Sequence, residues 1–273
     1  MLTMVGPHCT RPGTEAMAWA KVAPIVKSID SIEPFLVARE DAIRVFRHYW
    51  NSQPYQPNPN LYVNELLGAL QGYNYHNLYV EVGWNEAEID RYTLRLIVDE
   101  MHNQGYRTCG YALTNAEGNY NNLGFEFHRR NDWFGLKAVS LHAYWDKGGP
   151  ANPAWQWHAL AYRMCGWQPG DPPIFITECN METIDGTTTD DLRRLVNSDL
   201  NLNFIKAYND EIAKDPYVLG AVVYTVNAWP PIPDKHDATP YDVAPLVPQL
   251  IIPITKEETM PTEFELWKAE DEQ

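Results

Sequence analysis

Basic residues are scarce in this chain of 273 residues. Lysine and arginine together number 21 against 36 aspartates and glutamates, which gives a formal net charge of −15 at pH 7. Nucleic acids and anionic membrane surfaces are bound through basic patches, so this balance argues against both as partners. No apolar run approaches the length of a membrane span. No secretory signal is visible at the start, so we expect a protein that is cytoplasmic or released by another route.

Cysteine pairs and metal-binding motifs are also missing. The eight histidines form no HExxH motif, and CxxC spacing is absent from the four cysteines, Cys9, Cys109, Cys165 and Cys179. In a chain of this length, four scattered cysteines do not suggest a disulfide framework, so we expect free thiols. The stretch from Gly6 to Gly13 lacks the GxGxxG spacing of a phosphate-binding loop. The sequence therefore predicts neither a metal nor a cofactor.

Aromatic residues, in contrast, are plentiful, with ten Trp and sixteen Tyr. Core packing explains any one of them as readily as binding does. Several tryptophans, however, fall in stretches with the composition of loops, where a flat ring can stack on a sugar. These are Trp133, Trp145, Trp155, Trp157 and Trp229. Their positions favour a binding cleft.

Short apolar runs alternate with helical patterns between residues 2 and 230. The predicted strands are Leu2–His8, Pro24–Asp30, Ala42–Trp50, Leu78–Trp84, Tyr106–Leu113, Ala138–Trp145, Ile174–Glu178 and Leu219–Val226. The predicted helices are Thr14–Val22, Pro34–Arg39, Leu61–Leu70, Ala87–Asn103, Phe125–Phe134, Pro153–Cys165 and Thr189–Ala213. Such alternation implies parallel strands joined by right-handed crossovers. Eight units predict an α/β fold, a (β/α)8 TIM barrel of one domain, with an open doubly wound sheet as the alternative.

The composition changes after Pro230. Seven prolines lie within residues 230–253, interspersed with apolar residues. We expect this segment to replace or cover the last helix and to complete a barrel domain of residues 1–253. Residues 254–273 are acidic and weakly patterned, which predicts a tail or a linker.

Polar and aromatic residues gather at the predicted strand ends, where a barrel of this kind carries its active site. They are His8, Arg47, Asn85, Glu86, His142, Tyr144, Glu178 and Trp229. Glu86 and Glu178 follow strands four and seven and are 178 − 86 = 92 residues apart. A barrel mouth would bring these two carboxylates together, as hydrolysis of a glycosidic bond requires.

The pattern resembles the clan A glycoside hydrolases, which are retaining (β/α)8 enzymes that include cellulase-like families. The resemblance rests on Asn85-Glu86, His142-Ala143-Tyr144, Glu178 and Trp229. The chain also resembles compact cellulase-like barrels of bacterial and phage type. That second likeness rests on Gly6-x-His8, Trp84-Asn85-Glu86, Leu141-His142-x-Tyr144 and Ile176-Thr177-Glu178-Cys179.

The resemblance implies a role for each residue in acting on a carbohydrate substrate, and we expect the protein to be a monomer. Glu178 would be the nucleophile, held by hydrogen bonds from Tyr144 and Arg47, and Glu86 would be the acid/base. The pKa of Glu86 would need raising, by a dry setting against Trp84 or by the charge of Glu178. Asn85 would hold the sugar hydroxyl beside the anomeric carbon, Trp229 would lie beneath the ring, and His8 and His142 would donate or accept hydrogen bonds in the cleft.

Simpler interpretations stay open for these residues. Asn85-Glu86 has the composition of a helix N-terminus, Glu178 could be a loop carboxylate, His142 a core histidine and Trp229 packing for the Pro-rich segment. Strand parity does not decide among Arg44, Arg47 and His48 as the inward residue. A binding barrel without turnover and a lyase with an interior lysine are the alternative functions.

Lys27 and Glu81 present a separate pattern, because both fall in the middle of predicted strands. Alternate strands of a barrel contribute to the same interior layer, and these residues belong to strands two and four. A lone charge inside the barrel would be costly. The sequence therefore predicts a buried Lys27–Glu81 ion pair.

Overall fold

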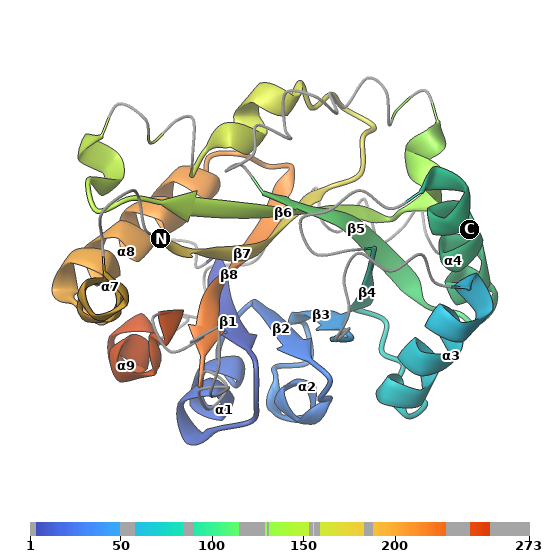
Figure 1. Cartoon of the computed structure of the whole chain (residues 1–273), viewed down its shortest axis with the longest axis horizontal. Helices are drawn as coiled ribbons and strands as arrows, with labels where there is room; N and C mark the ends of the chain where they lie inside the picture. The colour runs from blue at the N-terminus through green and yellow to red at the C-terminus, as the bar shows by residue number, and fades with distance from the viewer. Residues whose placement is uncertain are drawn as a thin grey trace.

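Eight parallel strands form a closed barrel in the order β1 to β8, with β8 paired to β1 (Figure 1). The computed structural model describes residues 4–49, 58–83, 90–114, 129, 131–152, 155, 159–182, 188–227 and 241–251. The strands are β1 Val5–Cys9, β2 Ile25–Ile29, β3 Ile43–Arg47, β4 Leu78–Val82, β5 Arg107–Thr114, β6 Ala138–Trp145, β7 Ile174–Met181 and β8 Val218–Val226. Closure confirms the predicted (β/α)8 barrel, and the open sheet is wrong.

The helices lie around the outside of this barrel (Figure 1). They are α1 Thr14–Ala20, α2 Glu33–Val37, α3 Pro59–Leu70, α4 Arg91–Asn103, α7 Thr189–Val196, α8 Asp199–Ile212 and α9 Val247–Leu250. Short 3₁₀ helices are η1 Asp132–Gly135, η2 Gly149–Ala151, η4 Ala161–Cys165 and η6 Ala244–Leu246. None of the helices in these described ranges is long and apolar enough to cross a membrane.

Three of the predicted helices differ from the structure where it describes them. The single helix expected over Thr189–Ala213 is two helices, because Ser198 caps α8 by accepting a hydrogen bond from the backbone N–H of Asn201. The expected helices Phe125–Phe134 and Pro153–Cys165 are described only in part: Arg129 is helical, and the 3₁₀ turns η1 and η4 cover Asp132–Gly135 and Ala161–Cys165.

The barrel interior is apolar at one end and charged at the other. Its apolar layer consists of Ile25, Ile43, Val45, Tyr79, Cys109, Ala138, Phe175 and Val222. Side chains two positions apart on a strand point to the same face. Ile25 and Tyr79 are therefore followed inside the barrel by Lys27 and Glu81, towards the C-terminal strand ends. The apolar layer thus forms a floor beneath a polar upper layer.

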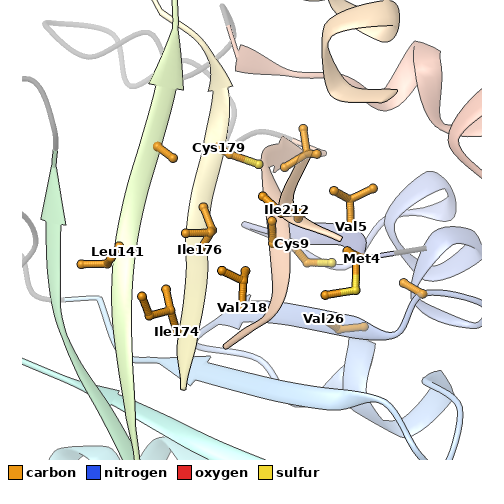
Figure 2. Packing of buried hydrophobic residues seen from close by; sticks show 14 of the residues in the cluster. Met4, Val5, Cys9, Val26, Leu141, Ile174, Ile176, Cys179, Ile212 and Val218 are labelled. Carbon is orange, nitrogen blue, oxygen red and sulfur yellow. The ribbon is translucent and has the colours of Figure 1, made fainter. Parts of the chain in front are cut away.

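The outer faces of the strands pack against the helices in a second, larger cluster. Figure 2 shows Ile176 and Cys179 of β7 among these buried apolar side chains, together with Leu141 of β6 and Val5 of β1. Ile212 brings α8 into the same cluster, and α8 contacts both β7 and β8. The cluster anchors the strands that carry the interior polar groups.

A register shift in β7 turns Glu178 into the barrel. Leu141 pairs with Ile176, whereas the next residue of β6, His142, pairs with Glu178, so Thr177 is an extra residue in β7. Ile176 and Cys179 both face the outer cluster, and Glu178, which lies between Thr177 and Cys179, faces inward. The sequence predicted that the strand ends at Glu178. In the structure β7 continues to Met181, so Glu178 lies within the strand. Such bulges re-aim side chains beside active sites.

The Pro-rich segment is described in part. Residues 241–251 form η6 and α9, and α9 lies beside α1 with Val247 and Leu250 buried (Figure 1). Residues 228–240 and 252–273 lie outside the described residues. The domain limit at 253 and the acidic tail beyond it stay predictions.

Candidate active site

Glu178 is the centre of a polar cluster in the upper layer of the barrel. The Tyr144 hydroxyl donates a hydrogen bond of 2.7 Å to its Oε2, and Lys27 Nζ lies 3.3 Å from its Oε1. His142 Nδ1 is 3.6 Å from Oε2, and His8 Nδ1 is 3.9 Å from Oε1. Only 6% of the Glu178 surface is exposed. The two hydrogen bonds, from the Tyr144 hydroxyl to one oxygen and from Lys27 to the other, hold this buried carboxylate in one orientation.

Glu81 joins the same cluster through Lys27. Lys27 Nζ lies 2.8 Å from Glu81 Oε2, and Arg47 Nη1 donates to that oxygen at 2.9 Å. The predicted Lys27–Glu81 ion pair is confirmed. The sequence had separated this pair from the active site, whereas the lysine contacts both carboxylates. Arg47 was expected to bond to Glu178, and its hydrogen bond goes to Glu81 instead.

The structure also decides which residue of β3 points inward. Arg44 faces outward, where it donates to the carbonyls of Arg39 and Ala42 and lies 4.3 Å from the centre of the Tyr75 ring. His48 follows the strand and bonds to Asp30 at the rim. Arg47 is therefore the inward cation, because it ends β3 on the same face as Val45.

The cluster fixes the charge state of its carboxylates. Burial raises the pKa of Glu178, but His142, Lys27, His8 and the Tyr144 hydroxyl outweigh it, and the pKa falls to about 2. For Glu81, burial is likewise outweighed, by Lys27 and Arg47, and the pKa lies well below its ordinary value. Both groups are ionised at pH 7.

His8 is neutral for the opposite reason. Burial and the Lys27 ammonium hold the pKa of this imidazole well below its ordinary value, although Glu178 acts the other way. Its ring centre lies 4.9 Å from that of Tyr224. Within the described residues neither ring nitrogen of His8 has a hydrogen-bond partner. A neutral imidazole here leaves the ammonium of Lys27 to balance the carboxylates.

The predicted site residues fall into two groups. The structure brings together His8, Arg47, His142, Tyr144 and Glu178. Asn85, Glu86 and Trp229 lie outside the described residues, as does Trp84. The acid/base role of Glu86 and the platform role of Trp229 therefore stay predictions.

Two further aromatic residues border the cluster and were missed. Tyr224 of β8 lies against His8, and the Tyr241 ring is 5.6 Å from Tyr224 and 6.5 Å from Tyr144. The Asn180 amide holds both tyrosines in place by donating to their backbone carbonyls. Strand parity could have found Tyr224. No periodic signal marks Tyr241, because it lies in the Pro-rich segment.

Among the described residues, neither a cysteine nor a metal site adds a further group to the cluster. Cys9, Cys109 and Cys179 are buried free thiols, and burial raises the pKa of each. Among the described residues, no three His, Cys, Asp or Glu side chains are placed to hold a metal ion.

No protein-family model matches the sequence, and no curated protein matches it. Solved structures do match. A GH128 (subgroup II) endo-β-1,3-glucanase from Sorangium cellulosum has a TM-score of 0.58 at 10% identity, covering 93% of this chain and 100% of that one. A GH128 (subgroup I) endo-β-1,3-glucanase from Amycolatopsis mediterranei, in complex with laminaritriose, has a TM-score of 0.52 at 12% identity, covering 90% and 98%.

The chain is similar in fold to glycoside hydrolase barrels. A third example is β-glucuronidase 2 from Bacteroides uniformis, with a TM-score of 0.52 at 10% identity, covering 81% of this chain and 30% of that one. The expected resemblance is thus confirmed at the level of the fold. One barrel fold supports many chemistries, so the activity has to be argued from the site.

Proposed function

We propose that this protein is a retaining glycoside hydrolase that cleaves a β-linked glycan, with Glu178 as nucleophile and Glu86 as acid/base. β-1,3-Glucans are the first substrates to test, because two of the similar barrels are named as endo-β-1,3-glucanases and one of them holds laminaritriose. The observation that carries the proposal is the Glu178 carboxylate, buried, ionised and oriented by Tyr144 at the mouth of such a barrel.

The proposed reaction has two displacements. First, a carboxylate oxygen of Glu178 attacks the anomeric carbon, the glycosidic C–O bond breaks, and the Glu86 carboxyl group gives its proton to the departing oxygen. Then the Glu86 carboxylate takes a proton from water, the water oxygen attacks the anomeric carbon, and Glu178 leaves as a carboxylate. The low pKa of Glu178 suits the first step, because the attacking oxygen must be ionised.

The lysine-dependent lyase is disfavoured by the surroundings of Lys27. A Schiff base needs a neutral, accessible amine. Lys27 is fully buried, and its Nζ contacts two ionised carboxylates. Held between two carboxylates and closed off from solvent, the amine is not accessible to a carbonyl substrate. A carbohydrate-binding barrel without turnover remains the competing function.

Hydrolysis is tested with oligosaccharides of β-1,3-glucan, β-1,4-glucan and β-mannan and with aryl β-glycosides. We expect new reducing ends from at least one substrate, initially as the β-anomer by NMR. Glu178→Gln should abolish turnover and keep binding, whereas Glu211→Gln on the outer helix α8 should leave the rate unchanged. Release of nothing by the wild-type protein while sugars still bind would favour the binding barrel.

The role of Glu178 has its own test. An activated 2-deoxy-2-fluoro-β-glycoside of the sugar that is cleaved should trap the covalent intermediate. Mass spectrometry of the peptides should then find the sugar on Glu178. Modification of another carboxylate would contradict the assigned nucleophile.

A further inference from the structure

Among the described residues of the barrel interior, one lysine contacts two carboxylates. Within the part of the chain that the structure describes, Lys27 and Arg47 are two cations that face the carboxylates of Glu81 and Glu178. Lys27 is fully buried and lies nearer to Glu81, at 2.8 Å, than to Glu178, at 3.3 Å. The ammonium group is therefore divided between the two carboxylates.

Both cations contact the same carboxylate oxygen of Glu81. Its Oε2 accepts from both Lys27 and Arg47, while its Oε1 has no hydrogen-bond partner among the described residues. Two cations thus converge on one oxygen of a carboxylate that no step of the proposed reaction uses. Buried ion pairs add little net stability in general, so stability alone is a weak reason for this arrangement.

We propose that Lys27 is a positioning residue that keeps Glu178 ionised and oriented, and that Glu81 limits this effect by holding the same ammonium. The inference rests on the proposed function. A buried carboxylate needs a nearby cation to stay ionised. A cation that binds this carboxylate alone, however, would make its oxygen a weaker nucleophile. Sharing the ammonium satisfies both needs.

Several other groups face Glu178, and the test has to separate them from Lys27. They are His8 on β1, Arg47 on β3, and His142 and Tyr144 on β6. The variants are therefore Lys27→Met and Glu81→Gln, which keep these groups in place. The matched control is Arg44→Met, which removes an equally buried cation on the outward face of β3.

The first readout does not depend on activity. In the full chain carrying ¹³C at glutamate carboxyls, the Glu178 signal is assigned by its loss in Glu178→Gln and followed against pH. In the wild-type protein, in Arg44→Met and in Glu81→Gln, we expect Glu178 to stay ionised down to the lowest pH at which the fold persists. In Lys27→Met the midpoint should rise by at least about one pH unit, since a buried carboxylate without its cation is disfavoured. If Glu178 in Lys27→Met also stays ionised to that lowest pH, the role of Lys27 is overturned, and protonation of Glu178 above that pH in Glu81→Gln would overturn the role of Glu81.

The second readout is kcat on the substrate that the wild type cleaves. Glu81→Gln should lower kcat about tenfold with KM nearly unchanged, because Lys27 then binds Glu178 alone. Unchanged kcat would contradict the sharing of the ammonium. If the wild type cleaves no glycan, the proposed function fails while the titration still decides the positioning. If Lys27→Met does not fold, the double variant Lys27→Met/Glu81→Gln keeps the interior neutral, and a Glu178 midpoint at the wild-type value there would overturn the proposal.

Discussion

Tyr144 reaches Glu178 Oε2 with a hydroxyl hydrogen bond of 2.7 Å, and this bond favours the ionised carboxylate. Tyr144→Phe keeps the ring and removes the donor. We expect the pKa of Glu178 to rise and kcat/KM to fall by about tenfold to a hundredfold, since a charge-assisted hydrogen bond contributes about 1.5–3 kcal/mol. Rates across a pH series measure both effects.

The control for that substitution is Tyr162→Phe. Its hydroxyl also donates to a carboxylate, Asp215, but on the outside of the barrel. Loss of activity in both variants to the same extent would mean that Tyr144 acts on stability rather than on Glu178. Comparing their urea unfolding curves separates the two effects.

Sequence reasoning found the residues of this cluster but not all of their partners. Lys27 and Glu81 could be paired because mid-strand charges on alternate strands share a layer. The partner of Arg47 could not be foreseen, because it depends on how far neighbouring strands are staggered. The inward turn of Glu178 depends on the extra residue Thr177, which leaves no trace in the apolar pattern. Non-local register, rather than residue type, set the limit.

At the scale of elements, two glycines predict opposite effects of one added methyl group. A Cβ on Gly6 of β1 would lie 1.8 Å from the Ile25 carbonyl oxygen, a backbone atom of the neighbouring strand. A Cβ on Gly68 of α3 would meet nothing within 4 Å. We expect Gly6→Ala to lower the free energy of unfolding by more than about 2 kcal/mol through backbone strain. Gly68→Ala should raise it by about 0.5–1 kcal/mol because alanine favours helix.

Urea denaturation of both variants checks these two signs. A neutral Gly6→Ala would mean that β1 can move away from β2 without cost.

The boundary between two helices could not be predicted from the sequence, since the spacing of apolar residues runs unbroken across Thr189–Ala213. The break at Ser198 comes from a side-chain cap, which periodicity does not detect.

For the whole molecule, counting alternating strands and helices was enough to predict closure. The barrel then sets the electrostatics, because it buries Lys27, Arg47, Glu81 and Glu178 together in its interior. The low pKa values of Glu178 and Glu81 mean that the folded state holds these groups ionised where the unfolded chain would protonate them. Their contribution to stability is present above pH 4.5 and is lost as the pH falls, for Glu178 towards its folded pKa of about 2.

As the pH is lowered, His8 should reduce the free energy of unfolding before Glu178 and Glu81 become protonated. The pKa of His8 in the folded state is lowered from an ordinary value of 6.5. Below that pH, His8 therefore binds a proton in the unfolded chain but not in the folded state. One such proton reduces the free energy of unfolding by up to about 1.4 kcal/mol per pH unit. His102, whose pKa is also lowered by burial, adds a change of the same sign. His8→Phe should therefore reduce the slope between pH 6.5 and 4.5 without abolishing it. Urea unfolding across this range measures the slope, with pH 7.5 as the reference where wild type and variant should run parallel. An unchanged acid slope would show that His8 is protonated inside the fold.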